Sequence, residues 1–221
     1  MFGGSQGEML LTPKFITFEG GEGVGKSTQT AHLAKFLQQK GISVLTTREP
    51  GGSPEAEKIR NLLVSGEVGL WNPKTEVHLH YAARIQHVAN FLMPSLESGK
   101  WVISDRFSDS TLAYQGFGYQ LDILKLKQLE TFSIGSFKPD FTILLDLPVS
   151  VGLVRTRGRQ KHEDRYERMG VDFHERVRNG FLEIAKLNQN RMVVIDAAQS
   201  EIAVSEQVLG KVCEKFQLDK I

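Results

Sequence analysis

The chain has 221 residues, of which 40% are hydrophobic and 24% are charged. This balance is typical of globular proteins and argues against a disordered or fibrous chain. Lys and Arg number 27 against 26 Asp and Glu, which gives a net charge of +1. This near-neutral charge argues against a nucleic-acid partner, because proteins that bind nucleic acids usually carry a larger excess of positive charge.

The first segment, residues 1–13, is expected to be a flexible tail because positions 3–7 are rich in glycine. Its first eleven residues contain no Lys or Arg and no long apolar run, which argues against a signal peptide. Residues 14–221 are expected to form a single domain. Since no window of about 18 apolar residues occurs, we expect no membrane partner.

Five short apolar or β-branched runs alternate with longer stretches of helical periodicity. The predicted strands are residues 15–18, 42–47, 101–104, 141–147 and 192–196. The helical stripes comprise Leu33, Ala34 and Leu37, then Val77, Tyr81, Ile85, Val88 and Leu92, then Leu153, Phe173, Val177, Phe181 and Ile184, and Gly41 follows the first as a C-cap. This alternation predicts an α/β fold with a five-stranded parallel sheet flanked by helices. Ligands of such sheets bind beyond the carboxyl ends of the strands.

A glycine-rich loop follows the first predicted strand and opens a helix. Residues 20–27 read Gly-Gly-Glu-Gly-Val-Gly-Lys-Ser and match the phosphate-binding pattern G-x-x-x-x-G-K-[ST]. Backbone N–H groups of such a loop cradle phosphates, Lys26 reaches the β and γ phosphates, and the hydroxyl of Ser27 is suited to Mg²⁺. The candidate ATP-binding residues here are Gly20, Gly21, Glu22, Gly23, Val24, Gly25, Lys26, Ser27 and Thr28.

A phosphate-binding loop indicates a nucleoside triphosphate but leaves three classes open: a small-molecule kinase, a GTPase switch, and a motor or nucleic-acid ATPase. The chain lacks the N-K-x-D and D-x-x-G patterns of a switch, and it is small and nearly neutral for a motor. The kinase is therefore favoured.

Two further motifs follow predicted strands. Asp105 and Arg106 come at the end of residues 101–104, where a P-loop fold places an acid near Mg²⁺ and where an arginine can bind a phosphate with two hydrogen bonds. Residues 47–52, Thr-Arg-Glu-Pro-Gly-Gly, follow the second strand as a rigid turn. Taken alone, the first motif is also compatible with a strand-end salt bridge and the second with a simple turn.

Together these residues resemble the thymidylate kinase family. The matching segments are residues 19–27, 47–52, 81–86 and 105–116, then Pro139-Asp140, residues 144–146 and residues 164–167. They occur in the expected order from about residue 14 onward. The resemblance implies phosphoryl transfer from ATP to dTMP, giving dTDP and ADP for dTTP synthesis, with Mg²⁺ as cofactor and a homodimer as the assembly.

The resemblance also implies a set of site residues. Arg84 would donate to O4 of thymine, Arg48 and Arg106 would lie near the acceptor phosphate, and Glu22 near the sugar 3′-hydroxyl and the metal. Tyr114 would crowd C2′ of the sugar. The implied dTMP-binding residues are Glu22, Arg48, Pro50, His80, Arg84, Arg106, Ser110, Thr111, Tyr114 and Gln115, the metal ligands Ser27 and Asp105, and the catalytic residues Lys26, Asp105, Arg106 and Glu22.

His80 is a departure from the family, which usually has Phe four residues before the arginine. His80, Arg84 and His87 fall on one helix face, which we expect to lie opposite the apolar stripe. We expect His80 to replace the stacking ring, the alternative being a polar helix residue with another ring stacking on the base. A zinc site built from His78, His80 or His87 is disfavoured, because their spacing fits no ligand set.

The segment at about 155–168 is predicted to be a mobile lid, because it contains six basic residues but only three acidic ones. A closing basic flap would stabilise the transferred phosphoryl group and exclude water. The resemblance implies the bacterial type with its catalytic arginine in the lid, since Gly23 stands where other members carry an arginine in the P-loop. The candidates are Arg157, Arg159 and Arg165, while Arg155 is expected to stack on adenine.

Two alternatives remain open from the sequence: another nucleoside monophosphate or deoxynucleoside kinase, and a nucleotide-dependent switch or binding protein. The single cysteine, Cys213, excludes an internal disulfide and a Cys-based zinc site, and its apolar helical surroundings predict a buried thiol. A reducing compartment fits this usage, so a cytoplasmic location is expected.

Overall fold

The computed structural model describes residues 12–156 and 165–219. The tail predicted over residues 1–13 lies almost entirely outside the described residues, as does most of the predicted lid. The described elements are β1 (Phe15–Glu19), α1 (Lys26–Gln39), β2 (Val44–Arg48), α2 (Pro54–Val64), α3 (Pro73–His87), the π-helical turn η1 (Val88–Leu92), α4 (Met93–Glu97), β3 (Trp101–Asp105), α5 (Ser108–Thr111), the π-helical turn η2 (Leu112–Gly118), α6 (Ile123–Ile134), β4 (Phe141–Asp146), α7 (Val149–Thr156), α8 (Val171–Leu187), β5 (Met192–Asp196) and α9 (Glu201–Phe216).

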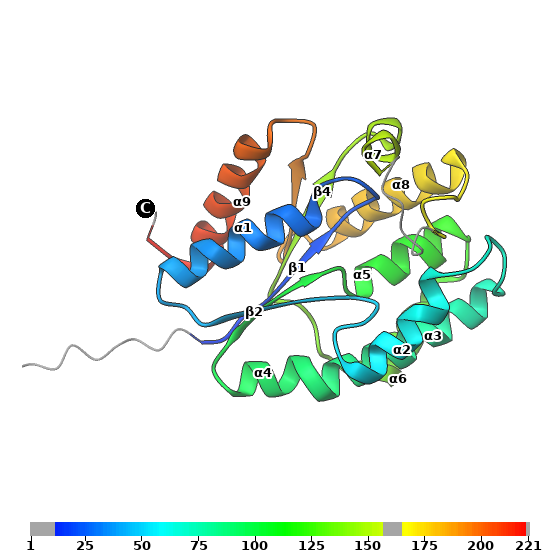
Figure 1. Ribbon diagram of the computed structural model, residues 1–221, viewed down its shortest axis with the longest axis horizontal. Helices are drawn as coiled ribbons and strands as arrows, with labels where there is room; N and C mark the ends of the chain where they lie inside the picture. The colour runs from blue at the N-terminus through cyan, green and yellow to red at the C-terminus, as the bar shows by residue number, and fades with distance from the viewer. Residues whose placement is uncertain (1–11, 157–164, 220–221) are drawn as a thin grey trace, which may run out of the picture.

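The sheet has five strands in the order β2-β3-β1-β4-β5, and every neighbouring pair is parallel. Helices α1 and α9 cover one face, and the other helices lie mainly on the opposite face and around the carboxyl ends of the strands (Figure 1). The predicted α/β fold is therefore confirmed, and each predicted strand is present with ends shifted by at most two residues. The second strand begins at Val44 because the backbone N–H of Ile42 still closes the end of α1 on the carbonyl of Leu37.

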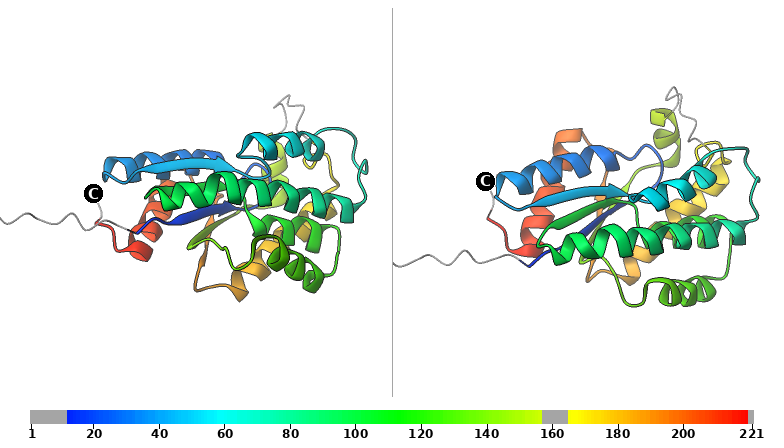
Figure 2. Two further views of the ribbon diagram at one scale, coloured as in Figure 1. Left: turned by 90° about the horizontal axis from the view of Figure 1, so that it is seen from below. Right: turned by 60° about the horizontal axis from the view of Figure 1, so that its bottom comes forward.

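Alternate side chains of the strands point to opposite faces of the sheet, and a hydrophobic core lies on each face. Ile16 and Phe18 of β1 pack under α1 and α9, against side chains such as Leu33 and Val208. Phe15 points to the other face, where it packs with Val102 and Phe107. These strands carry apolar side chains on both faces because helices cover both, as Figure 2 shows from two further directions.

The helix formed by α3, η1 and α4 corrects one prediction. Val77, Tyr81, Val88 and Leu92 are buried as expected, but Ile85 is 39% exposed. Arg84 and His87 are instead buried beside the apolar residues, not opposite them. Their polar groups find buried partners on other elements, which the spacing of one helix cannot reveal.

Cys213 is buried in α9 and unbonded to another cysteine, as predicted. Within the described ranges, 12–156 and 165–219, we find no helix with the length and apolar character needed to cross a membrane.

Candidate active site

The phosphate-binding loop lies between β1 and α1 as predicted, and its shape depends on glycine. Gly23 has φ +69°, and a Cβ there would lie 2.2 Å from the carbonyl oxygen of Gly152 in α7. Gly25 has φ +95° and forms the N-cap of α1. The helix therefore begins at Lys26 with its free backbone N–H groups directed at the loop, an arrangement suited to anions.

A cavity of about 790 Å³ opens at the carboxyl ends of the strands, next to this loop. It brings together most of the residues predicted from the sequence: Glu22, Gly23, Val24, Gly25, Lys26, Ser27, Thr28, Arg48, Pro50, His80, Arg84, Asp105, Arg106, Ser110, Thr111, Tyr114, Gln115 and Arg155. Gly20 and Gly21, at the start of the same loop, do not line this cavity but a smaller pocket that shares Glu22 and Val24 with it. The volume suits small ligands such as nucleotides.

At the centre of the cavity, Arg106 links the loop to η2. It has a positive φ of 71°, and its guanidinium donates to the carbonyl of Gly20 at 2.8 Å, to Glu22 at 2.9 Å and to the hydroxyl of Tyr114 at 2.9 Å. Tyr114 in turn donates to Glu22 at 2.6 Å. Burial raises the pKa of Glu22, but Arg106, Lys26 and Tyr114 outweigh it and lower that pKa to about 2. Glu22 is therefore ionised at neutral pH.

Lys26 and Ser27 begin α1. The Nζ atom of Lys26 donates to the carbonyl of Gly21 at 2.7 Å and to that of Gly20 at 3.2 Å. The hydroxyl of Ser27 donates to Asp105 at 2.8 Å, which places the two predicted metal ligands side by side at the cavity wall. Hydroxyl and carboxylate oxygens suit Mg²⁺, which completes its shell with water and phosphate oxygens. The residues present therefore fit this ion.

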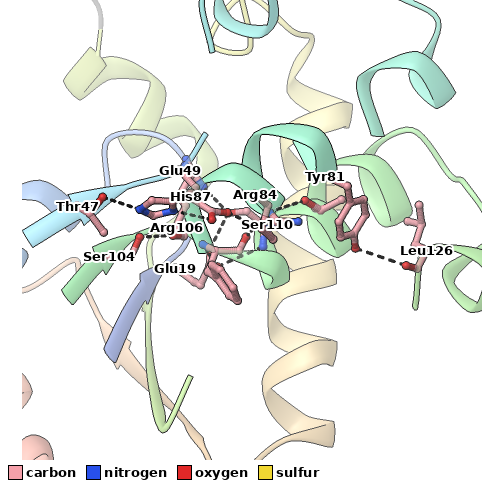
Figure 3. Close-up of polar contacts among 12 residues, drawn as sticks. Glu19, Thr47, Glu49, Tyr81, Arg84, His87, Ser104, Arg106, Ser110 and Leu126 are labelled. Atoms are coloured by element: carbon pink, nitrogen blue, oxygen red, sulfur yellow. Dashed lines mark hydrogen bonds and ion pairs between the residues drawn. The ribbon is translucent and has the colours of Figure 1, made fainter. Parts of the chain in front are cut away.

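One end of the cavity is built on a buried ion pair. Nε of Arg84 donates to Oε2 of Glu49 at 2.8 Å, and its Nη2 donates to the carbonyl of Phe107 and to the hydroxyl of Thr111. His87 lies on the far side of Glu49, with Nδ1 2.9 Å from Oε1 and Nε2 2.8 Å from the hydroxyl of Thr47 (Figure 3). Burial raises the pKa of Glu49, but Arg84 and His87 outweigh it, so the pKa lies below its usual value.

Beneath the same end, Glu76 accepts four hydrogen bonds. Arg165 and Tyr119 donate to Oε1, and Tyr166 and Gln115 donate to Oε2. Both Glu76 and Arg165 are at most 1% exposed. The hydroxyl of Tyr166 also lies 3.0 Å from Nε2 of His80. Burial, followed by the charges of Arg84 and Arg165, lowers the pKa of His80 to about 3, so this ring is neutral at pH 7.

Among the cavity residues, Nη1 of Arg84, a donor, and the Oε1 atoms of Gln115 and Gln29, both acceptors, are buried without a hydrogen-bond partner in the described part of the chain. Another carboxylate, that of Glu19, is fully buried at the end of β1 and accepts from Ser110 and from the backbone N–H of Phe107. Burial and then the charge of Asp109 raise the pKa of Glu19 to about 8.

The predicted lid is only partly described. Arg157 and Arg159 lie outside the described residues. Arg155 lies in the last turn of α7, lines the cavity and donates to the carbonyl of Ala197 at 3.4 Å. Arg165 does not line the cavity; it is bound to Glu76 and to the carbonyl of Leu63 in α2.

Sequence reasoning missed several residues of this site. The cavity is also lined by Ala197 and Gln199, which follow β5, and by Glu201, the first residue of α9. Glu49 and Tyr166 line the cavity as well, and Glu76, which does not line it, contacts Tyr166. Glu49 and Tyr166 stand inside segments that matched the family pattern, which is the signal that would have found them. Glu76 has no such signal, because its partners come from distant parts of the chain.

The comparisons with known proteins agree with this geometry. The model of the thymidylate kinase family matches residues 18–208. A thymidylate kinase of Magnetococcus marinus is 46% identical over 203 residues, which cover 92% of this chain and 97% of the relative. One of Caulobacter vibrioides is 47% identical over 204 residues, covering 92% and 98%. The crystal structure of thymidylate kinase from Ehrlichia chaffeensis superposes with a TM-score of 0.73 at 35% identity, covering 90% of this chain and 98% of that one.

Proposed function

The chain belongs to the thymidylate kinase family, whose reaction is the phosphorylation of dTMP to dTDP by ATP, and from this premise we propose how its own residues serve that reaction. One observation carries the proposal. The unpartnered donor of Arg84 and the unpartnered acceptor of Gln115 belong to the same end of the cavity. Thymine presents the complementary pair, an O4 acceptor and an N3–H donor. Cytosine presents the reverse pattern, which would leave both protein atoms unsatisfied at a cost of about 1–3 kcal/mol each.

The thymine ring is proposed to rest against His80, with Arg84 on O4 and Gln115 on N3–H. Arg48, Pro50, Ser110 and Thr111 complete the wall around the base and the acceptor phosphate. Tyr114 is held by Arg106 and Glu22, so its ring position is fixed, and we assign it to the sugar. We assign the 3′-hydroxyl of the sugar to Glu22, which is ionised and able to accept a hydrogen bond from it.

The ATP phosphates are proposed to lie in the loop formed by residues 20–27, with the adenine between Arg155 and residues 197–201. Lys26 and Ser27 are at the start of α1, where backbone N–H groups add to their attraction for phosphate. Ser27 and Asp105 would hold Mg²⁺, which supplies charge neutralisation at the β and γ phosphates. An acceptor phosphate is already an anionic nucleophile, so no general base is required and positioning by Lys26 and Arg106 dominates.

A lid arginine completes the proposed charge stabilisation, with Arg157, Arg159 and Arg165 as the sequence candidates. Gly23 supports the choice of the lid over the P-loop, since a side chain at that position would collide with the backbone of Gly152. The burial of Arg165 against Glu76 favours Arg157 or Arg159 as the group that meets the phosphates.

We also propose a homodimer. Large apolar side chains are exposed on α6, where Phe132 is 87% and Leu124 71% exposed, and Ile85 is exposed on the neighbouring helix α3. Exposed apolar groups of this size mark contact surfaces. Light scattering after size exclusion tests the dimer, and a mass of one chain would contradict it. A cytoplasmic location completes the proposal, because the reaction consumes ATP and the single cysteine, Cys213, forms no disulfide.

The first experiment measures ADP release from Mg-ATP with dTMP, dUMP, UMP, dCMP, AMP or thymidine as acceptor. A strong and selective response to dTMP is expected. A preference for another nucleotide would overturn the assignment of Arg84 and Gln115, and release without an acceptor would favour a switch or binding protein.

A further inference from the structure

We propose that Glu76 is a specificity-determining positioning residue: it fixes the orientation of the Gln115 amide so that the oxygen, not the nitrogen, is offered to the base. The inference rests on the proposed function, because it takes the cavity end between Arg84 and Gln115 as the thymine site. Glu76 itself does not line the cavity and acts only through Gln115 and Tyr166.

A glutamine amide can sit in either of two orientations of similar shape, which place opposite hydrogen-bonding groups at the same point. Nε2 of Gln115 lies 3.4 Å from Oε2 of Glu76 and 3.3 Å from the hydroxyl of Tyr166. A carboxylate only accepts. If Gln115 were reversed, its oxygen would face that carboxylate with no proton between them, inside a region where Gln115 is 1% exposed. The buried carboxylate therefore selects one orientation.

Tyr166 adds to this selection. Its pKa lies well above the usual value because of burial and the charge of Glu76, so it keeps its proton and donates it to Oε2 of Glu76 at 2.9 Å. A tyrosine hydroxyl has one proton and two acceptor positions. The acceptor positions are then left for Nε2 of Gln115 and Nε2–H of His80. Both contacts at Gln115 Nε2 thus call for a donor, which leaves Oε1 as the group for the ligand.

Arg165 compensates the charge of the buried Glu76 carboxylate. A buried carboxylate without a cation would take up a proton or destabilise the fold, and Arg165 meets Oε1 of Glu76 on the side away from Gln115. Oε1 is thereby reserved for Arg165 and Tyr119, and Oε2 for Tyr166 and Gln115. The two carboxylate oxygens therefore have separate tasks, one structural and one in specificity.

This division predicts the effect of Glu76→Gln. Arg165 will hold the oxygen of the new amide at the position of Oε1, so the new nitrogen takes the position of Oε2. That nitrogen is a donor, and it calls for an acceptor from Gln115. The Gln115 amide is then expected to reverse and to present its nitrogen to the base, while Arg165 keeps a partner.

The test compares kcat/KM for dTMP with that for 5-methyl-2′-deoxyisocytidine monophosphate, whose base keeps O4 but has N3 as an acceptor. Wild type should prefer dTMP, and in Glu76→Gln the ratio of analogue to dTMP should rise by about tenfold or more. Tyr119→Phe is the matched control, since it removes a hydroxyl from the Oε1 side alone and should leave the ratio unchanged. An unchanged ratio in Glu76→Gln, or an equal loss for both nucleotides, would overturn the proposal.

Circular dichroism and thermal melting establish that the variant folds. If Glu76→Gln does not fold, the double variant Glu76→Leu/Arg165→Met removes carboxylate and cation together, which avoids an unpaired buried charge. It frees the Gln115 amide, so the ratio should again rise, and a ratio equal to that of wild type would count against the proposal. A wild-type enzyme that fails to prefer dTMP over dCMP would instead contradict the proposed function.

Discussion

Oε2 of Glu49 lies 2.8 Å from Nε of Arg84, and neither side chain is more than 4% exposed. The pair joins the turn after β2 to the last turn of α3, across 35 residues of sequence. His87, one turn further along α3, contacts the other carboxylate oxygen. The arginine proposed to read O4 is thus held in place by a buried carboxylate.

Removing the carboxylate of Glu49 should destabilise the fold. In Glu49→Ala, Arg84 stays buried with an uncompensated charge, so we expect the free energy of unfolding to fall by about 3–5 kcal/mol. Urea denaturation measures it. Lys211→Ala is the control, because Lys211 and Glu214 form an exposed pair whose loss should change the free energy by less than about 1 kcal/mol. Equal small changes in both variants would contradict the buried-pair argument.

A side chain at Gly23 should abolish activity. Gly23→Arg would place a Cβ 2.2 Å from the carbonyl oxygen of Gly152 at a positive φ, so α7 or the loop must move. Steady-state kinetics should show a loss of kcat/KM for ATP. The control is Gly21→Ala, where the nearest atom to the new Cβ lies 4.0 Å away and activity should be largely retained. An active Gly23→Arg enzyme would reopen the assignment of the catalytic arginine to the lid.

The sequence was sufficient for the sheet and the loop because both rest on local rules. Strands covered on two faces require continuous apolar runs, and the loop requires glycines at fixed spacing before Lys26. The same rules failed at Ile85. Amphipathic periodicity assumes that polar residues face water, whereas Arg84 and His87 face Glu49. A buried polar partner from another element cannot be read from one helix.

The candidate site divides along the same line. Residues that touch the proposed ligands, such as Arg84 and Gln115, stand in motifs that could be matched. Of the residues that orient them, Glu49 and Tyr166 also stand in such motifs, whereas Glu76 does not. Glu76 meets Arg165 across 89 residues and Tyr166 across 90, so only the folded chain shows that these groups belong together.

Acid should destabilise the wild type more steeply than His80→Phe. The pKa of His80 is about 3 in the folded protein, against 6.5 for an unperturbed histidine. Between pH 3 and pH 6.5, the ring of His80 is therefore protonated in the unfolded chain and neutral in the folded protein. The neutral ring therefore contributes stability at pH 7 that is lost as the pH falls from 6.5 to 3. Urea unfolding from pH 7 to 4 should show a shallower decline for His80→Phe, and parallel curves would argue against a neutral buried ring.

The same variant tests the stacking role. If His80 serves as the platform for thymine, Phe can replace it, since the aromatic face is kept while only the hydrogen bond to Tyr166 is lost. The KM for dTMP should change little in His80→Phe and rise strongly in His80→Ala. A large loss of dTMP affinity in His80→Phe would show that the polar edge of the ring, and not its face, matters for binding.

The arginines at 157, 159 and 165 should separate into two kinds when each is replaced by Met. The catalytic one should lower kcat by on the order of 10³-fold with little change in the KM for dTMP, because its charge acts on the transferred phosphoryl group. Arg165→Met should instead lower the free energy of unfolding by about 3–5 kcal/mol, since it leaves Glu76 buried and unpaired. Adding Glu76→Leu to Arg165→Met should recover most of that stability, because no unpaired charge then stays buried. If the role of Arg165 were to bind phosphate, the second substitution would restore nothing. Equal and modest effects on kcat at all three positions would contradict a single lid arginine in catalysis.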